Sequence, residues 1–121
     1  MSKINIKVTI ENDDQKQQIT TNAIIQDNIL KYKEENNTIV KFNYLNNNLI
    51  RENNDIYMDY KFKKGISKNK LLLKKYNKEL IIDINTTKIE KTENGIEIDY
   101  IIEKDEFKYK IEVIKWQYCK N

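Results

Sequence analysis

The chain has 121 residues and a mass of 14.6 kDa, which fits one domain over residues 1–121 with a core of its own. Its 22 Lys and Arg against 19 Asp and Glu give a net charge of +3, milder than that of dedicated nucleic-acid-binding domains. With no His, two Gly and one Cys, the sequence excludes His-dependent nucleophilic catalysis, glycine-rich phosphate loops and zinc or iron–sulfur centres. No apolar run approaches the length of a membrane-spanning helix and no signal sequence opens the chain, so we predict a soluble, cytoplasmic protein without a membrane partner.

Apolar and polar residues alternate along most of the chain, which is the period of a β-strand. In the first half this alternation predicts strands over residues 4–10, 19–25, 29–33, 40–44, 49–50 and 56–62. The segments between them are rich in Asn and Asp. Because Asn tolerates the left-handed conformation of tight turns, we expect these Asn clusters to replace the missing glycines.

The second half continues the pattern with one ambiguous segment. Residues 66–76 fit either a helical turn or a strand carrying Leu71 and Leu73, and we favour the strand. Residues 80–84 alternate again, and Ile89 lies in the next predicted strand. The Asn94-Gly95 dipeptide predicts a tight hairpin.

The segment from Gly95 to Trp116 predicts a second hairpin, with a turn near residues 104–105. Its apolar face combines residues 96, 98, 100 and 102 with residues 107, 109, 111 and 113. Pairing Glu97 with Lys110 and Asp99 with Lys108 matches opposite charges, and we predict this register.

These elements amount to about eight to ten short strands separated by frequent turns. A sheet closed on itself removes the exposed edges that promote aggregation. We therefore predict an all-β fold, a small antiparallel up-and-down β-barrel, with a two-sheet sandwich as the alternative.

Most of the chain resembles a bacterial family of unknown function, the YwiB-like proteins. The residues that carry the resemblance are Tyr32, Arg51, Met58, Phe62, Gly65, the segment 86–89, Ile96, Ile98 and Tyr100. The resemblance implies a calycin-type, lipocalin-like β-barrel and brings no catalytic residues.

Arg51 is the only arginine beside 21 lysines (22 basic residues less Arg51). A guanidinium offers a rigid fork of donors that an ammonium group cannot imitate. We favour a structural role, as a member of an ion pair or as a clamp at the end of the barrel. The alternative is an anchor for the anionic head of a ligand.

Aromatic residues on the predicted inner face are the second candidate group. Several buried tyrosines need partners for their hydroxyls, which indicates either wet barrel ends or a polar ligand. An interior filled by side chains and an interior that holds one small ligand are about equally compatible with these residues. The predicted ligand-binding residues are Arg51, Tyr32, Tyr44, Tyr60, Tyr100 and Tyr109.

A basic stretch covers residues 61–75, and aromatic residues near it could stack on bases. We favour a solvated face over a nucleic-acid site there. The lysines of the predicted basic patch are Lys61, Lys63, Lys64, Lys68 and Lys70.

Two further features receive plain structural interpretations. The acidic segment 11–14 lacks the ligand spacing of a calcium loop, so we interpret it as a solvated turn and predict no metal site and no cofactor. Trp116 falls on the outer face of its strand unless a bulge turns it inward, and Cys119 is interpreted as a terminal thiol without a role.

The sequence thus favours a protein without enzymatic activity that binds a small, partly apolar ligand at the mouth of a barrel. The alternative is a surface interaction protein that binds RNA or another anionic partner through residues 61–75. A hydrolase built on carboxylates is the least favoured because His and the usual nucleophilic arrangements are missing.

Overall fold

The structure, a computed structural model, describes the backbone of residues 2–117 and the side chains of residues 2–114. Within this part, the three-residue helical turn η1 is the one helical element, and no helix is long and apolar enough to cross a membrane. The elements in chain order are β1 (Ser2–Asn12), β2 (Lys16–Gln26), β3 (Ile29–Glu34), β4 (Thr38–Asn43), β5 (Asn48–Glu52), β6 (Ile56–Lys61), β7 (Gly65–Leu73), η1 (Lys74–Tyr76), β8 (Lys78–Thr92), β9 (Gly95–Ile102) and β10 (Asp105–Gln117).

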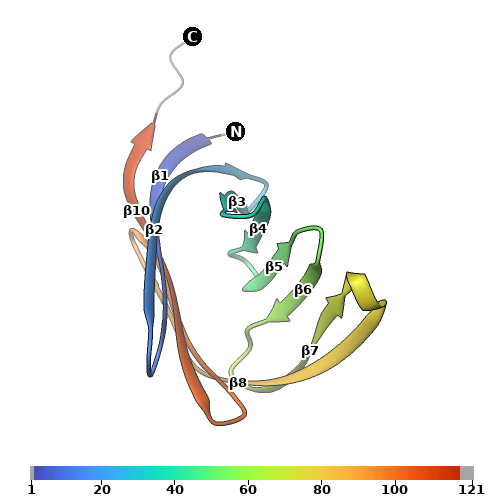
Figure 1. Cartoon of the computed structure of the whole chain (residues 1–121). Coiled ribbons are helices and arrows are strands. Elements are labelled where there is room, and N and C mark those ends of the chain that lie inside the picture. Colours follow the sequence, from blue (N-terminus) through green and yellow to red (C-terminus); the bar gives the residue numbers. More distant parts are fainter. Residues whose placement is uncertain (1, 118–121) are drawn as a thin grey trace.

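Each strand pairs antiparallel with the strand before and after it in the chain, and β1 pairs with β10 to close the sheet. Figure 1 shows the first and last strands side by side, with the shorter strands β3–β6 on the opposite side of the barrel. The predicted up-and-down barrel is therefore confirmed, with ten strands, and the two-sheet alternative was wrong.

Asparagine supplies the left-handed turn conformations that the sequence predicted. Asp27 and Asn28, which join β2 to β3, have φ angles of 52° and 67°. Asn36 and Asn37 between β3 and β4, and Asn47 before β5, also have positive φ. These short polar side chains accept this region of backbone space more readily than branched ones, so the chain turns without glycine.

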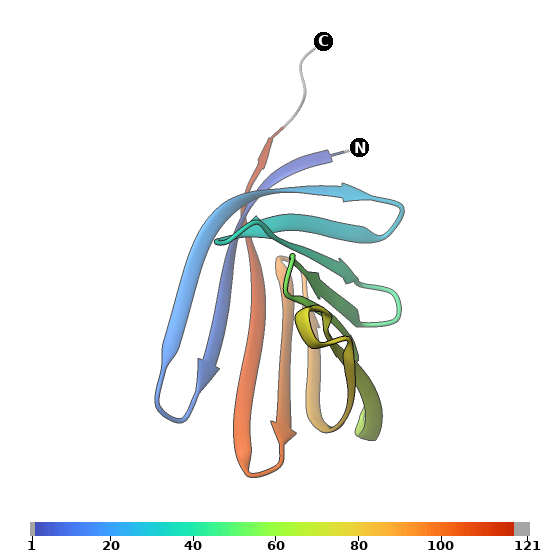
Figure 2. The ribbon, with the colours of Figure 1, turned by 45° about the vertical axis from the view of Figure 1, so that its right-hand side comes forward.

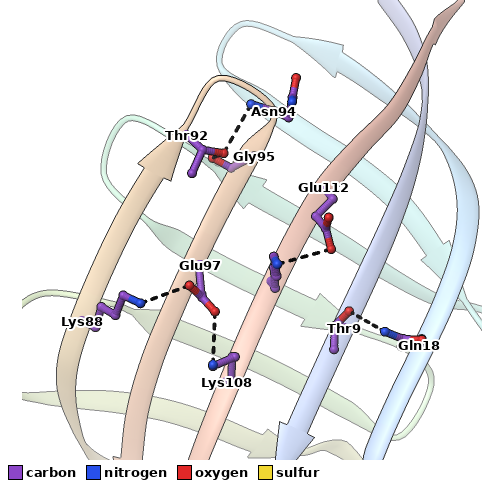
Figure 3. Close-up of polar contacts among 10 residues, drawn as sticks. Thr9, Gln18, Lys88, Thr92, Asn94, Gly95, Glu97, Lys108 and Glu112 are labelled. Atoms are coloured by element: carbon purple, nitrogen blue, oxygen red, sulfur yellow. Dashed lines mark hydrogen bonds and ion pairs between the residues drawn. The ribbon is translucent and has the colours of Figure 1, made fainter.

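The β9–β10 hairpin has the predicted register. Asp99 lies opposite Lys108 and Glu97 lies opposite Lys110. On the face of the sheet turned away from the core, Glu97 also accepts contacts at 3.2 Å from Lys88 and Lys108 (Figure 3). These hydrogen bonds to the two lysines lower the pKa of Glu97. Matched charges on the outer face therefore reinforce the register that the apolar inner face requires.

The segment around residue 87 corrects one prediction. Residues 80–84 and Ile89 were predicted to lie in separate strands, but β8 runs unbroken through both. A register shift between Thr86 and Lys88 leaves Thr87 as the extra residue of a bulge against β9. The alternation reverses at a bulge, and this reversal looks in the sequence like a strand end.

The ambiguous segment 66–76 contains both of the structures that the sequence allowed. β7 continues as a strand through Leu71 to Leu73, and the 3-10 turn η1 follows it at Lys74–Tyr76. Asn77 then closes the turn with a φ of 47°. The favoured strand is confirmed for the residues that carry the leucines.

Side chains fill the middle of the barrel. The largest fully buried ones are Tyr109, Phe42 and Phe62, together with aliphatic residues from β1, β4, β5, β8 and β9. The rings of Phe42 and Tyr109 lie 6.1 Å apart, and those of Phe62 and Tyr100 lie 4.8 Å apart. Any space for a ligand must therefore lie at the ends or along the sides of the barrel.

Candidate functional site: the two ends of the barrel

Arg51 and Glu34 form a bidentate ion pair inside one end of the barrel. The Arg51 side chain shares the inner face with its cross-strand neighbours Val40 and Met58, both of which are buried. Its Nη2 donates a hydrogen bond of 3.0 Å to Glu34 Oε2. Its Nε lies 2.9 Å from Oε1, close enough for an ion pair although not aligned as a hydrogen bond. The carboxylate at the end of β3 therefore engages both sides of the guanidinium fork.

This ion pair offsets the effect of burial on the arginine. Burial alone would lower the pKa of Arg51, but the adjacent Glu34 carboxylate raises it, so the net pKa lies above its ordinary value. Each of the two side chains is 19% exposed. The pair is thus a mostly buried ion pair of the kind predicted as the structural role of Arg51.

Next to the ion pair, two tyrosines satisfy each other. The hydroxyl oxygens of Tyr32 and Tyr109 lie 2.6 Å apart, across the barrel from β3 to β10. Burial raises the pKa of Tyr32 to about 12, and it raises the pKa of Tyr109 well above its ordinary value. The positive charge of Arg51 opposes both shifts. The two hydroxyls therefore stay neutral over the physiological range.

Tyr60 and Tyr100 extend the polar interior toward β6 and β9. Burial raises the pKa of Tyr100 to about 12 and also raises that of Tyr60, while Arg51 lowers both through its charge. Thr86, the strand partner of Tyr100, has a buried hydroxyl without a hydrogen-bond partner among the described residues. A polar group in this position is usually satisfied by an ordered water.

A small hollow opens beside the ion pair, and we call it the polar hollow. Its volume is about 250 Å³. The walls come from the inner faces of β1 and β2 on one side and from the β3–β4 hairpin and Arg51 on the other. The residues that line it are Val8, Ile10, Gln17, Ile19, Glu34, Glu35, Asn36, Thr38 and Arg51. Since Glu34 already holds the guanidinium, this hollow offers an incoming anion a site whose charge is largely neutralised.

A larger hollow at the opposite end of the barrel has mainly apolar walls, and we call it the apolar mouth. Its volume is about 360 Å³. β1 reaches both hollows, because Ile4 lines the apolar mouth and Val8 and Ile10 line the polar hollow. The apolar mouth is lined by Ile4, Ile25, Leu30, Phe42, Tyr44, Leu45, Ile96, Ile111, Val113 and the β8–β9 turn from Lys91 to Gly95.

The rim of the apolar mouth carries one cation. The Lys91 ammonium group donates a hydrogen bond of 2.7 Å to the backbone oxygen of Tyr44, which links the β8–β9 turn to the β4–β5 turn. Leu45, in the same turn as Tyr44, is 68% exposed. An exposed leucine and a lysine thus stand together at the entrance to an apolar hollow.

The structure divides the predicted ligand-binding residues into two groups. Arg51, Tyr32, Tyr60, Tyr100 and Tyr109 form the first group in the interior, where the hydroxyls of Tyr32 and Tyr109 are hydrogen-bonded and the charge of Arg51 lowers the pKa of all four tyrosines.

Tyr44 belongs to neither the network nor the polar hollow, because it lies in the β4–β5 turn at the apolar mouth. Sequence reasoning missed the remaining lining of that mouth, including Lys91. Its residues come from distant strands, and only the closure of the barrel brings them to one end.

The predicted basic patch is partly neutralised. Lys68 is paired with Asp83 at 3.2 Å, and Lys70 with Glu79 at 3.7 Å, both across the β7–β8 pairing. Lys61, Lys63 and Lys64 are exposed and have no carboxylate within ion-pair distance in the described part of the chain. Their role in binding an anionic partner stays a prediction.

The acidic segment 11–14 covers the last two residues of β1 and the start of the turn to β2. The side chain of Asn12 accepts hydrogen bonds from the backbone N–H groups of Asp14 and Gln15, as in a typical Asx turn. Among the described residues, no group of three or more potential ligands could hold a metal ion.

The last strand contains the irregularity that the sequence allowed near Trp116. The pairing of β1 with β10 shifts between Asn5, which pairs with Lys115, and Ile6, which pairs with Val113, so Ile114 is the extra residue. The side chain of Trp116 and the whole of Cys119 lie outside the described residues, and the interpretations of both stay predictions.

Comparison with known proteins identifies a barrel of the same design. No protein-family model and no curated protein matches the sequence. The crystal structure of the ywiB protein from Bacillus subtilis matches with a TM-score of 0.53 and 19% sequence identity, over 93% of this chain and 90% of that chain. The two proteins share a fold. The resemblance to the YwiB-like proteins is thereby confirmed for the fold over nearly the full length of both chains.

Proposed function

We propose that the protein is a non-enzymatic binding protein that takes a small, partly apolar ligand in the apolar mouth. The observation that carries the proposal is a hollow of about 360 Å³ whose walls are mainly the apolar inner faces of the strands. This volume lies in the usual range for small-molecule sites, which combine apolar walls with few polar groups. Removal of the ligand's apolar surface from water supplies most of the affinity.

The polar part of the ligand is best accommodated at the rim. Lys91 is among the residues that line the apolar mouth, and its bond to the Tyr44 carbonyl uses one of its three donors. Arg51 is a weaker candidate because Glu34 occupies its fork and because it lines the hollow at the other end. A ligand with an apolar body and one acidic or hydrogen-bond-accepting group suits this arrangement.

Filling the apolar mouth with a larger side chain tests the proposal. Ile25→Trp places an indole in the hollow, whereas Ile66→Trp makes the same replacement at a residue that is 76% exposed on β7 and is the matched control. The probe is 1-anilinonaphthalene-8-sulfonate, an apolar body with one anionic group. We expect Ile25→Trp to weaken its binding by about tenfold or more and Ile66→Trp to leave it unchanged.

Native mass spectrometry of protein purified without denaturation complements the titration, since a retained small molecule should disappear in the Ile25→Trp variant. The proposal is wrong if the probe binds both variants and the parent protein equally. It is also wrong if neither a retained ligand nor saturable probe binding is found for the folded parent protein.

A further inference from the structure

The barrel is closed unevenly, because β2 has a partner on both sides along only part of its length. It pairs with β1 over residues 16–25 but with β3 only over residues 23–26. In residues 16–22 of β2, the described part of the chain provides no second strand. Figure 2 shows this half of β2 at the margin of the sheet, with β1 on one side only. Alternate residues there direct their N–H and C=O groups away from β1.

This free edge lacks the features that normally protect an edge strand. Natural edges carry charges, proline or bulges that prevent further pairing. Residues 16–22 of β2 contain one charged residue, Lys16, and no proline. Another partly unpaired strand is β8, whose residues 78–84 face no strand on the β9 side and carry the charged Lys78, Glu79 and Asp83. The edge of β2 is therefore the more receptive of the two.

Hollows lie on both sides of the gap between β2 and β3. On the inner side, Gln17 and Ile19 line the polar hollow. On the outer side, Asn22 and Ile24 line a groove of about 540 Å³ that extends to β3, and we call it the outer groove. A strand added to this edge would direct alternate side chains toward these two hollows.

The outer groove is basic. Lys3, Lys31 and Lys33 line it, and all three are exposed without a carboxylate at ion-pair distance in residues 2–117. Lys31 also lies directly opposite Lys41 on β4, which is an unfavourable pairing of like charges. An acidic partner would offset this repulsion. The inner side has the opposite character, because Glu34 and Glu35 border the polar hollow together with apolar residues of β1 and β2.

We propose that an extended, acidic segment of another protein binds here as an added strand along residues 16–22 of β2. Its backbone pairs with the free edge, its acidic side chains lie toward the outer groove, and its apolar side chains lie toward Ile19. This proposal is independent of ligand binding in the apolar mouth.

A second copy of this chain suits the edge less well. Antiparallel pairing of two β2 edges about Ile19 would place Lys16 of one copy opposite Asn22 of the other, beside the basic outer groove. The added strand would then bring positive charge to a basic surface. Charge complementarity therefore favours an acidic peptide over self-association.

The probe is a synthetic peptide as long as the free edge, with glutamate and valine in strict alternation and both ends blocked. Two versions are N-methylated, one at every glutamate and one at every valine. In an added strand only one of these sets of N–H groups faces β2. We therefore expect one methylated peptide to lose binding, by about tenfold or more, and the other to bind about as well as the parent peptide.

Hydrogen exchange locates the peptide on the protein. The parent peptide should slow the exchange of alternate backbone amides in residues 16–22 while amides of residues 78–84 exchange as before. Lys31→Gln combined with Lys33→Gln should weaken peptide binding about three- to tenfold, which corresponds to two exposed charge contacts. The matched control, Lys61→Gln combined with Lys63→Gln, removes two exposed charges elsewhere and should leave binding unchanged.

Several outcomes would overturn the proposal. Equal loss of binding with both methylated peptides, or binding without slower exchange in β2, would show attraction by charge alone. Concentration-dependent protection of β2 without peptide would show that a second copy occupies the edge. Absence of peptide binding together with salt-sensitive binding of single-stranded RNA would assign the lysines to a nucleic acid.

Discussion

Removal of one partner from the Arg51–Glu34 pair should destabilise the barrel more than removal of both. Glu34→Gln leaves the guanidinium in a site that is only 19% exposed, with an amide in place of its anion. Arg51→Met leaves the carboxylate without its cation beside the tyrosine hydroxyls. The double variant leaves neither charge behind, so its cost should be less than the sum of the two single costs.

The magnitude follows from the geometry of the pair. With Nε and Nη2 at 2.9 and 3.0 Å from the two carboxylate oxygens, the charge centres are about 4 Å apart. At the effective permittivity typical of partly buried protein sites this separation corresponds to about 4 kcal/mol of attraction. Desolvation of the two charges and solvent screening of the partly exposed side chains offset part of it. We expect about 2–3 kcal/mol for each single substitution and a coupling energy of about 1–2 kcal/mol.

Urea denaturation of the parent protein, the two single variants and the double variant measures this coupling. The matched control is the Lys68–Asp83 pair, whose side chains are 78% and 63% exposed and which should show no measurable coupling in the cycle Lys68→Met with Asp83→Asn. A coupling energy between Arg51 and Glu34 as small as that of the control pair would refute the view that this pair holds the end of the barrel together.

Three further predictions follow from the described contacts. Gly95→Ala should destabilise the protein by about 2–3 kcal/mol in urea denaturation, because the added Cβ would collide with a backbone carbonyl of β10. Gly65 has open space around it, so Gly65→Ala should cost only about 1 kcal/mol, for the positive φ of this residue. Tyr32 and Tyr100 have pKa values of about 12 in the folded protein and about 10 in the unfolded chain. The free energy of unfolding should therefore be constant below pH 10 and fall as the pH rises to 12, by about 1.4 kcal/mol per tyrosine at pH 11. A titration of tyrosinate absorbance in the folded protein that shows no tyrosines ionising near pH 12 would contradict this. Glu97→Gln should lower the thermal midpoint slightly at low salt and not at high salt, because its two ion pairs are on the surface, and an effect that survives high salt would indicate another cause.

The sequence was most informative where local chemistry and the sheet agree. Alternation predicted the strands, because a residue's face in a strand depends only on its position parity. The charges at Glu97, Asp99, Lys108 and Lys110 predicted the register of one hairpin, since a shift by two residues would bring acids together. Asparagine predicted turns through its own backbone preference.

The sequence was misleading where the same residue has two uses. Gly95 looked like the second residue of an Asn-Gly turn, yet it begins β9, and the turn consists of Glu93 and Asn94 between the paired Thr92 and Gly95. Its small size is required instead by the close approach of the Ile111 carbonyl on β10. Nothing local distinguishes a glycine chosen for its φ angle from one chosen for its missing side chain.

The candidate sites depended on long-range closure and could be predicted only in part. Arg51 was singled out as the only arginine, but its partner Glu34 is 17 residues away on another strand. The short β2–β3 pairing and the hollows beside it arise from the tilt and length of strands around the whole barrel. The tilt and stagger of the strands depend on the whole barrel, so no single segment of the sequence predicts them.

The aromatic interior and the single arginine explain each other. Eight strands already enclose about as much space as side chains can fill, so a barrel of ten strands needs large residues at its centre. Tyrosine supplies that volume but brings a hydroxyl that must be satisfied. Tyr32 and Tyr109 satisfy each other, and Glu34 balances the charge of the neighbouring Arg51. The polar network is therefore a consequence of filling a wide barrel, and the recognition sites that we propose, the apolar mouth and the free edge of β2, lie outside it.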